Sequence, residues 1–142
     1  MSIRVAQFAP GRMFHALADR QDLIERLVRV SNGRATSDSV VASFFAPGVT
    51  LWAIIEDDAL AGFAVTTTAM YAGGSAVRVL DVVTDQGVYE RHAPELFAHL
   101  EAYARAIGAR WVDFEGRPGW IDWAKQAGFK ARRVVFTKEV AS

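Results

Sequence analysis

The fold is decided by residues 51–84, which read LWAIIEDDALAGFAVTTTAMYAGGSAVRVLDVVT. Leu51–Ile55 is apolar and rich in strand formers, and Leu60–Tyr71 is a longer run of Val, Thr and Phe. The acidic triplet between them has the composition of a hairpin tip, and a Gly-Gly pair precedes a third such run at Val77–Thr84. Three consecutive strands joined by tight turns predict an antiparallel meander at the centre of a sheet.

Strand and helix signals flank this meander on both sides. Before it, the sequence predicts a strand over Ile3–Phe8 closed by a turn at Pro10-Gly11, a helix over Leu23–Val28 ended by Asn32-Gly33, and a short helix from its cap at Ser37 to Pro47-Gly48. After it, the sequence predicts a helix from near Pro94 to Gly108, a strand at Trp111–Glu115, a helix over Trp120–Ala127 capped by Gly128, and a final strand over Ala131–Val140.

The length and composition of the chain indicate a single globular domain and argue against several classes of protein. The chain has 142 residues, 51% of them hydrophobic, and no linker or repeat, so we expect a single domain over residues 1–142. Sixteen basic residues balance sixteen acidic ones, which argues against a nucleic-acid-binding protein. The absence of cysteine excludes disulfides, thiolate metal sites and a cysteine nucleophile. Without a secretory signal or an apolar run of ~18 residues, we expect no membrane contact and a cytoplasmic location.

The closing residues Trp123-Ala124-Lys125-Gln126-Ala127-Gly128-Phe129 are similar to the last helix and Gly-Phe turn of the GNAT (N-acetyltransferase) superfamily. The hairpin that holds Gly62 also resembles that family's central hairpin. The resemblance covers nearly the whole chain. It implies an α/β (α+β) fold with a central mixed, mostly antiparallel sheet of about six strands flanked by about four helices. The turn Glu115-Gly116-Arg117-Pro118-Gly119-Trp120 further resembles small GNAT-like proteins of bacteriophage genomes.

The same resemblance implies a site for acetyl-CoA. In this superfamily the fourth strand splays from the fifth, its backbone holds the pantetheine arm, and a [Q/R]-x-x-G-x-[G/A] loop wraps the pyrophosphate at a helix N-terminus. Here Tyr89 and Arg91 stand where the two small residues belong, so the sequence shows no glycine-rich cradle. Asp85 and Glu90 add negative charge, which Arg91 and His92 could offset. The positions that correspond to the site are Val82, Val83 and Thr84 in the strand and Gln86, Gly87 and Arg91 after it.

A carboxylate near the strand junction is the expected general base. Asp81 lies among valines in the middle of a predicted strand, where Asp is depleted, and apolar surroundings raise the pKa of an acid toward the range useful for base catalysis. Glu115 is the second candidate. The alternative for both is a solvated side chain, or for Asp81 an ion pair with Arg78 or Arg110. The tyrosine that many GNAT members use to protonate the leaving thiolate falls at Ala124, which cannot donate a proton.

Two functions stay open at this point. The first is an acyl-CoA-dependent N-acyltransferase acting on a small amine or a protein amine. The second is a GNAT-like fold without transfer activity that binds a protein partner, for example as a component of a phage particle, which would place it in a virion. A homo-oligomer is expected under both, because the last strand can pair across a two-fold axis. His15, His92 and His99 have no metal-ligand spacing, so no metal is predicted.

Overall fold

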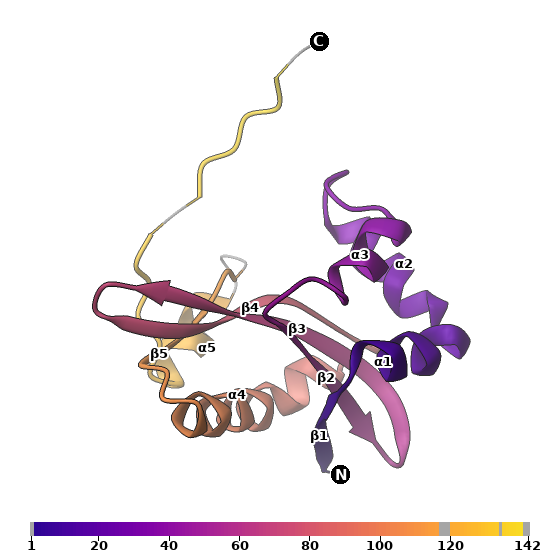
Figure 1. The fold of residues 1–142 in the computed structure, drawn as a ribbon, viewed down its shortest axis with the longest axis horizontal. Coiled ribbons are helices and arrows are strands. Elements are labelled where there is room, and N and C mark those ends of the chain that lie inside the picture. The colour runs from indigo at the N-terminus through magenta and orange to yellow at the C-terminus, as the bar shows by residue number, and fades with distance from the viewer. Residues whose placement is uncertain (1, 117–119, 134, 141–142) are drawn as a thin grey trace.

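The computed structural model describes residues 2–116, 120–133 and 135–140, and within them it shows one five-stranded sheet with helices on both faces (Figure 1). The strands are β1 (Ile3–Phe8), β2 (Val49–Glu56), β3 (Ala59–Tyr71), β4 (Gly74–Thr84) and β5 (Trp111–Phe114). They lie in the order β1-β2-β3-β4-β5, antiparallel throughout except for the parallel pair β4–β5. The predicted mixed, mostly antiparallel sheet is confirmed, with five strands in place of about six.

Within the same described residues the helices are α1 (Pro10–Ala16), α2 (Gln21–Val30), α3 (Ser37–Ser43), α4 (Val88–Ala106) and α5 (Ile121–Gln126). A turn of 3-10 helix over Leu17–Asp19 joins α1 to α2. None of these helices is long and apolar enough to span a bilayer. The turn at residues 117–119, which carried part of the phage resemblance, lies outside the described residues.

The meander forms as the sequence predicts. Asp57 and Asp58 at the β2–β3 tip have φ angles of 52° and 62°, the left-handed pair that a tight two-residue hairpin requires. The register then runs from Glu56 opposite Ala59 to Val49 opposite Thr67. Alternation along the strands sends successive side chains to opposite faces.

Two apolar clusters lie on the two faces of the sheet. Leu51 and Ala53 of β2 pack with α1, α2 and α3, whereas Trp52 and Ile54 pack with α4. Figure 1 shows α4 on one side of the sheet and the three N-terminal helices on the other. The apolar face of α4 packs on the sheet, and this packing sets the direction of the first helical turn, which begins after a loop of three residues that follows β4.

Gly62 lets β3 and β4 approach closely. A Cβ atom at this position would lie 2.4 Å from the carbonyl oxygen of Val83 and 2.8 Å from Cα of Thr84. These are backbone atoms of β4, so no side-chain movement can relieve the clash. Only glycine fits at this position. Because it lies opposite Thr84, it allows the end of β4 to lie close against β3.

Three predicted boundaries are wrong. Pro10-Gly11 begins helix α1 instead of ending a turn, because proline at the first helical position has no N–H to lose. Thr36, not Ser37, caps α3, in a reciprocal capping box with Ser39. Helix α4 starts at Val88 and continues through Pro94, because the burial of its first two turns against the sheet offsets the cost of an internal proline.

The predicted final strand is also wrong. Residues 131–133 and 135–140 form no strand, and all of them are exposed. Figure 1 shows this C-terminal segment leaving the body of the molecule in an extended path. Its sequence favours a strand, but within the described residues no neighbouring strand bonds to it, and an isolated strand has no ladder to stabilise it.

Candidate functional site

The pairing between β4 and β5 is short. It begins at Ala76 opposite Trp111 and ends at Val79 opposite Phe114. Beyond that point, residues 80–84 of β4 still pair with β3, but no described strand covers their other side. Apart from the carbonyl of Thr84, which accepts a hydrogen bond from Arg26, the backbone groups on this open side are available to an extended ligand.

A β-bulge marks the place where the two strands part. Val79 lies opposite Thr66 of β3 and Asp81 opposite Val65, so Leu80 is an extra residue in β4. A bulge bends its strand, increases the local twist and interrupts pairing. The side chain of Leu80 is 49% exposed, as expected for a residue pushed out of the ladder. No sequence signal predicted this bulge.

The loop after β4 leads straight into α4. Gly87 takes the N-cap position with φ of 81°, in the left-handed region, and no side chain caps the helix. The amide of Val88 donates to the carbonyl of Asp85, and that of Tyr89 to Oγ1 of Thr84 at 3.2 Å. Among the described residues, the amides of Gln86 and Gly87 have no hydrogen-bond acceptor. The first turn of α4 therefore presents donors and the positive end of a helix dipole.

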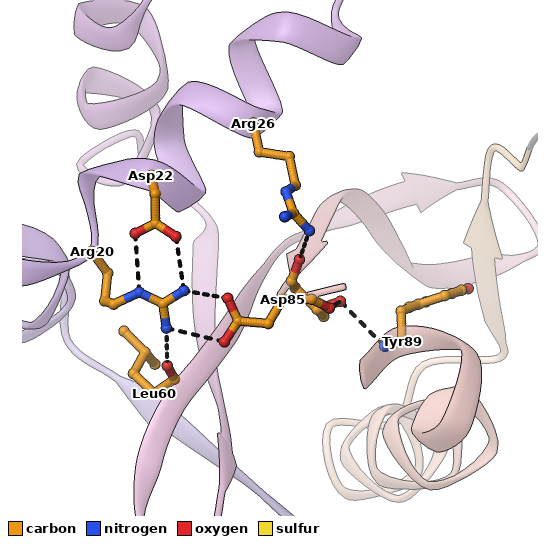
Figure 2. A network of polar contacts seen from close by, with 7 residues as sticks. Arg20, Asp22, Arg26, Leu60, Asp85 and Tyr89 are labelled. Carbon is orange, nitrogen blue, oxygen red and sulfur yellow. Dashed lines mark hydrogen bonds and ion pairs between the residues drawn. The ribbon is translucent and has the colours of Figure 1, made fainter. Parts of the chain in front are cut away.

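Arg20 ties the entry of this loop to the N-terminal helices (Figure 2). Its guanidinium forms a bidentate pair with Asp22, through Nε–Oδ1 at 3.0 Å and Nη2–Oδ2 at 2.9 Å. The same group donates to both carboxylate oxygens of Asp85 and to the carbonyl oxygen of Leu60. Hydrogen bonding to Asp22 and Asp85 raises the pKa of Arg20 above its ordinary value, and the bond from Arg20 lowers the pKa of Asp22.

This network answers a difficulty in the sequence. Asp85 adds negative charge beside the position that the resemblance gives to a pyrophosphate, with Arg91 and His92 as the groups that could offset it. In the structure its carboxylate is paired with Arg20, so the charge is neutralised on the side of the sheet that carries α2. Arg26 of α2 adds a second positive group near the loop, because its Nη1 donates to the carbonyl oxygen of Thr84 at 2.6 Å.

A second polar cluster lies on the other side of the loop. Arg91 extends over Gly87 and pairs with Glu56, with Nη2 3.3 Å from Oε2. His92 is only 5% exposed, and its two ring nitrogens lie 2.8 Å from Glu56 and 2.9 Å from Glu95. Burial tends to raise the pKa of Glu56, but the hydrogen bonds from His92 and Arg91 outweigh it, and the pKa is lowered. Arg91 is thus held beside the amides of the loop.

The predicted base Asp81 lies at the parting of the strands. Alternation puts it on the same sheet face as Val83, opposite the face that α4 covers. Its side chain is half-buried, and burial raises the pKa of its carboxyl. No described arginine forms an ion pair with it, so the predicted partners Arg78 and Arg110 do not neutralise it. Arg110 instead donates to the carbonyl of Gly73.

The second predicted base, Glu115, follows the last paired residue of β5 and is exposed. By alternation it shares a face with Asp113, the face on which Asp81 also lies. Both carboxylates therefore border the open end of the β4–β5 pair. Asp81, Val82 and Thr84 lie at the end of β4 and Gly87 in the loop after it, whereas Glu115 follows β5. The side chain of Val83 packs in the core cluster under α1–α3, and that of Val82 packs against the cluster under α4.

The aromatic side chains divide between this region and the core. Tyr103 contacts Trp52 with ring centroids 4.8 Å apart, so it belongs to the cluster under α4, as expected. Tyr89 stacks on Trp120 at 4.8 Å, next to the mouth between the strands. Burial raises the pKa of Tyr89 to about 12, so its hydroxyl stays protonated at neutral pH. The hollow behind the loop holds ≈ 10 Å³, at most about one water, so a ligand would lie over the loop.

Sequence reasoning missed Arg20, Arg26 and Glu56. Their partners lie 65, 58 and 36 residues away in the chain, so no local spacing reveals them. The described residues hold no group of three or more His, Asp or Glu side chains arranged to bind a metal ion.

Comparison with known proteins identifies the fold. No protein-family model matches the chain, and no curated protein matches its sequence. Solved structures do match it. An aminoglycoside acetyltransferase, HMB0005 from an uncultured soil metagenomic sample, is 16% identical, with a TM-score of 0.70 over 99% of this chain and 100% of that chain. Glucosamine-6-phosphate N-acetyltransferase from Arabidopsis thaliana is 14% identical, with a TM-score of 0.69 over 99% and 100%.

The aminoglycoside N-acetyltransferase AAC(6')-Iy in complex with CoA is 17% identical, with a TM-score of 0.71 over 99% of this chain and 96% of that chain. At these identities the likeness concerns the fold. The chain has the fold of the GNAT N-acetyltransferases, as its sequence predicted.

Proposed function

We propose that this protein is an acyl-CoA-dependent N-acyltransferase that acts on a small-molecule amine. One observation carries the proposal: β4 parts from β5 at Leu80 and runs directly into a glycine-capped helix with free amides. An extended thioester arm needs unpaired strand backbone, and a pyrophosphate needs a helix N-terminus, and here the two are consecutive in the chain. The likeness to a CoA-bound acetyltransferase supports the same conclusion.

The proposal gives each part of acyl-CoA a group of residues that would hold it. The backbone groups of Val82 and the N–H of Thr84 would hold the pantetheine arm on the open side of β4, whereas those of Val83, also predicted for this role, point at β3. The amides of Gln86 and Gly87 would donate to the pyrophosphate. The loop lacks the glycines that would let its backbone come close to the pyrophosphate, and Arg91, 48% exposed at its side chain, would contribute a positive charge instead.

Acyl-CoA supplies an electrophilic thioester carbonyl, and the residues around the bulge supply the rest of the chemistry. Backbone N–H groups of the open β4 edge polarise the carbonyl oxygen. Asp81 would accept the proton that the amine loses when its nitrogen forms the new C–N bond and the C–S bond breaks, and Glu115 is the alternative acceptor. Ala124, at the position where the resemblance implies a tyrosine, offers no proton, so the departing thiolate would take its proton from water.

The amine is proposed by class only. The solved structures with this fold include aminoglycoside and glucosamine-6-phosphate N-acetyltransferases, so amino sugars are the first class to test. The alternative, a non-catalytic binding component of a phage particle, gains no support from these matches and stays a hypothesis.

Thiol release tests the proposal directly. Because the chain has no cysteine, every thiol detected by a chromogenic reagent comes from CoA, and the protein contributes no background. We expect thiol release from acetyl-CoA only when an amino sugar is added, and mass spectrometry should show one added acetyl group. The Asp81→Asn variant should lower kcat roughly 100-fold, the lower end of the usual contribution of a general base.

Glu101→Gln, an exposed position on α4, is the matched control and should keep full activity. Thiol release that is equal with and without every amine, or an Asp81→Asn variant as active as the parent, would overturn the proposed chemistry.

A further inference from the structure

Helices α1–α3 cover one end of the sheet face that carries Asp81. They pack over an apolar cluster that reaches Val65 of β3 and Val83 of β4. The β3–β4 hairpin extends further, and Figure 1 shows it projecting away from these three helices. Past the cluster, the same face carries half-buried polar side chains: Thr67 of β3, Arg78 of β4 and Asp113 of β5. An amine that reaches Asp81 from this side lies beside them.

The bulge in β4 puts Arg78 on the same face as Asp81. Side chains three positions apart in a regular strand point to opposite faces. Here the extra residue changes that, because Arg78 lies opposite Thr67 and Asp81 opposite Val65, two residues of β3 that share a face. Burial agrees, since Val79, next to Arg78, packs under α4 on the other face. The two charged residues are therefore neighbours, roughly 7 Å apart along the sheet, the rise of two strand residues.

The guanidinium of Arg78 has no partner among the described residues. The side chain is half-buried, but no hydrogen bond or ion pair within the described part of the chain reaches it. Its cross-strand neighbour Asp113 and the nearby Asp81 both lie beyond ion-pairing distance. Partial burial of an unpaired guanidinium is unfavourable, and an anionic group on a ligand would relieve that cost.

Other arginines around β4 and the loop after it are engaged by protein groups. These are Arg20 with Asp22 and Asp85, Arg26 with the carbonyl of Thr84, Arg91 with Glu56, and Arg110 with the carbonyl of Gly73. Arg78 differs from all four, because its N–H donors are available to a ligand.

The charges on this face complement a molecule that carries both signs. The carboxylates of Asp81 and Asp113 attract an ammonium group. The planar guanidinium of Arg78 beside them can donate two parallel N–H bonds to a carboxylate or a phosphate. An amine that also bears an anion satisfies both kinds of group, whereas an amine without one leaves Arg78 unpaired.

From these observations we infer that the amine substrate carries an anionic group, a carboxylate or a phosphate, and that Arg78 binds this group. The amine lies at Asp81, and the anion lies further along the same face toward the β3–β4 turn. The inference rests on the proposed acyltransferase function and names the class of its acceptor. Arg78 is thus a specificity-determining residue and takes no part in the transfer itself.

Matched pairs of amines test the inference through thiol release from acetyl-CoA. Glucosamine 6-phosphate with glucosamine, and β-alanine with β-alaninamide, each keep the amine and remove the anion. We expect kcat/KM to be at least about tenfold higher for the anionic member of one pair, as for the gain of one charge-assisted bond, and the pair that shows it identifies phosphate or carboxylate as the group. Arg78→Met should abolish this preference by raising the KM for the anionic member, and Arg78→Lys should keep part of it.

Two controls accompany these variants. Activity on the neutral member, unchanged in Arg78→Met, shows that the variant folds. Arg29→Met, at an exposed position on α2, should keep the preference of the parent. Equal kcat/KM for both members of both pairs, or an Arg78→Met variant that loses as much on the neutral member as on the anionic one, would refute the inference and leave the acyltransferase function standing.

Binding measurements separate the two claims if no thiol is released from any pair. Calorimetric titration with glucosamine 6-phosphate and with β-alanine, in the presence and absence of desulfo-CoA, should give a heat of binding for one of them that Arg78→Met abolishes. Binding of this kind without transfer would reject the acyltransferase chemistry and keep Arg78 as the anion-binding residue. If neither ligand binds in a way that depends on Arg78, the inference is wrong.

Discussion

At the scale of single residues, two features shape the site: the missing side chain of Gly62, and the lack of a basic partner for Asp81 among the described residues. Gly62 has no Cβ, which lets β3 lie against the last residues of β4. Asp81 has no basic partner among the described residues, and burial raises the pKa of its carboxyl. The first feature fixes the backbone proposed to bind the thioester arm, and the second suits the carboxylate to accept a proton.

Gly62→Ala should destabilise the protein by about 3 kcal/mol, because the new methyl would meet backbone atoms of Val83 and Thr84 that cannot rotate away. Chemical denaturation measures the change. Gly11→Ala is the matched control: an added Cβ there meets nothing within 4 Å and lies in helix α1, so stability should stay equal or rise. Equal midpoints for the two variants would contradict the close approach.

Asp81→Asn should change how stability depends on pH. A raised pKa in the folded state means that the protonated carboxyl is favoured by folding, so the contribution of Asp81 is fully present below about pH 4, its unfolded pKa, and is lost as the pH rises through the folded pKa. The variant should therefore gain stability over the parent between pH 4 and pH 7. Because the side chain is only half-buried, the gain should be under about 1 kcal/mol.

Denaturant melts at several pH values measure this difference. Glu101→Gln, an exposed acid on α4, should show no such trend. A stability difference between Asp81→Asn and the parent that shrinks from pH 4 to pH 7 would contradict the assigned burial.

At the scale of elements, the loop between β4 and α4 is held from both sides. Arg20 and Arg26 attach it to the region of α2, and Arg91 attaches it to Glu56 at the end of β2. The loop is thus placed by long-range contacts and not by a glycine-rich sequence. The amides of Gln86 and Gly87 are therefore unpaired within the described part of the chain, just before the helix, even though the sequence there carries no glycine-rich phosphate-binding motif.

Arg20→Lys should loosen this loop. A lysine ammonium cannot replace a planar guanidinium that bonds Asp22, Asp85 and the Leu60 carbonyl at once. We expect a loss of about 1–2 kcal/mol in the free energy of unfolding, from lost charge-assisted hydrogen bonds, and faster amide exchange over residues 85–91. Hydrogen–deuterium exchange read by mass spectrometry measures it.

Arg29→Lys, at an exposed position on α2, the helix that Arg20 precedes, is the control and should leave the exchange of this loop unchanged. Identical protection of the loop in the two variants would show that Arg20 does not hold it.

Sequence patterns predicted the elements whose signals are local. The meander follows from strand formers and tight turns, and the ends of α4 and α5 follow from Gly108 and Gly128, both at positive φ. The start of α4 was missed because Pro94 normally marks a first turn, and here burial outweighs that preference. The bulge at Leu80 and the partners of Arg20 depend on packing between distant segments, so no short pattern records them. The prediction of a strand over Ala131–Val140 is wrong because composition shows which residues favour a strand but not whether a neighbouring strand is there to pair with them.

At the scale of the whole molecule, the two apolar clusters determine where the site can lie. Helix α4 on one face and helix α2 on the other both contact β4, so the strand and the loop after it are held from two sides. The fold, predicted from the order of elements, is confirmed by solved structures at 12–17% identity. Fold alone does not assign an activity, so the cofactor site stays a proposal that binding must test.

Calorimetric titration with acetyl-CoA, repeated with desulfo-CoA, tests the central claim most directly. The account predicts micromolar binding of both ligands, weakened about tenfold by Arg91→Ala through the loss of one charge-assisted bond of roughly 1.4 kcal/mol, and unchanged by Arg105→Ala at the far end of α4. No heat of binding at millimolar ligand, from a protein that unfolds cooperatively, would contradict the claim that the open edge of β4 and the first turn of α4 form an acyl-CoA site.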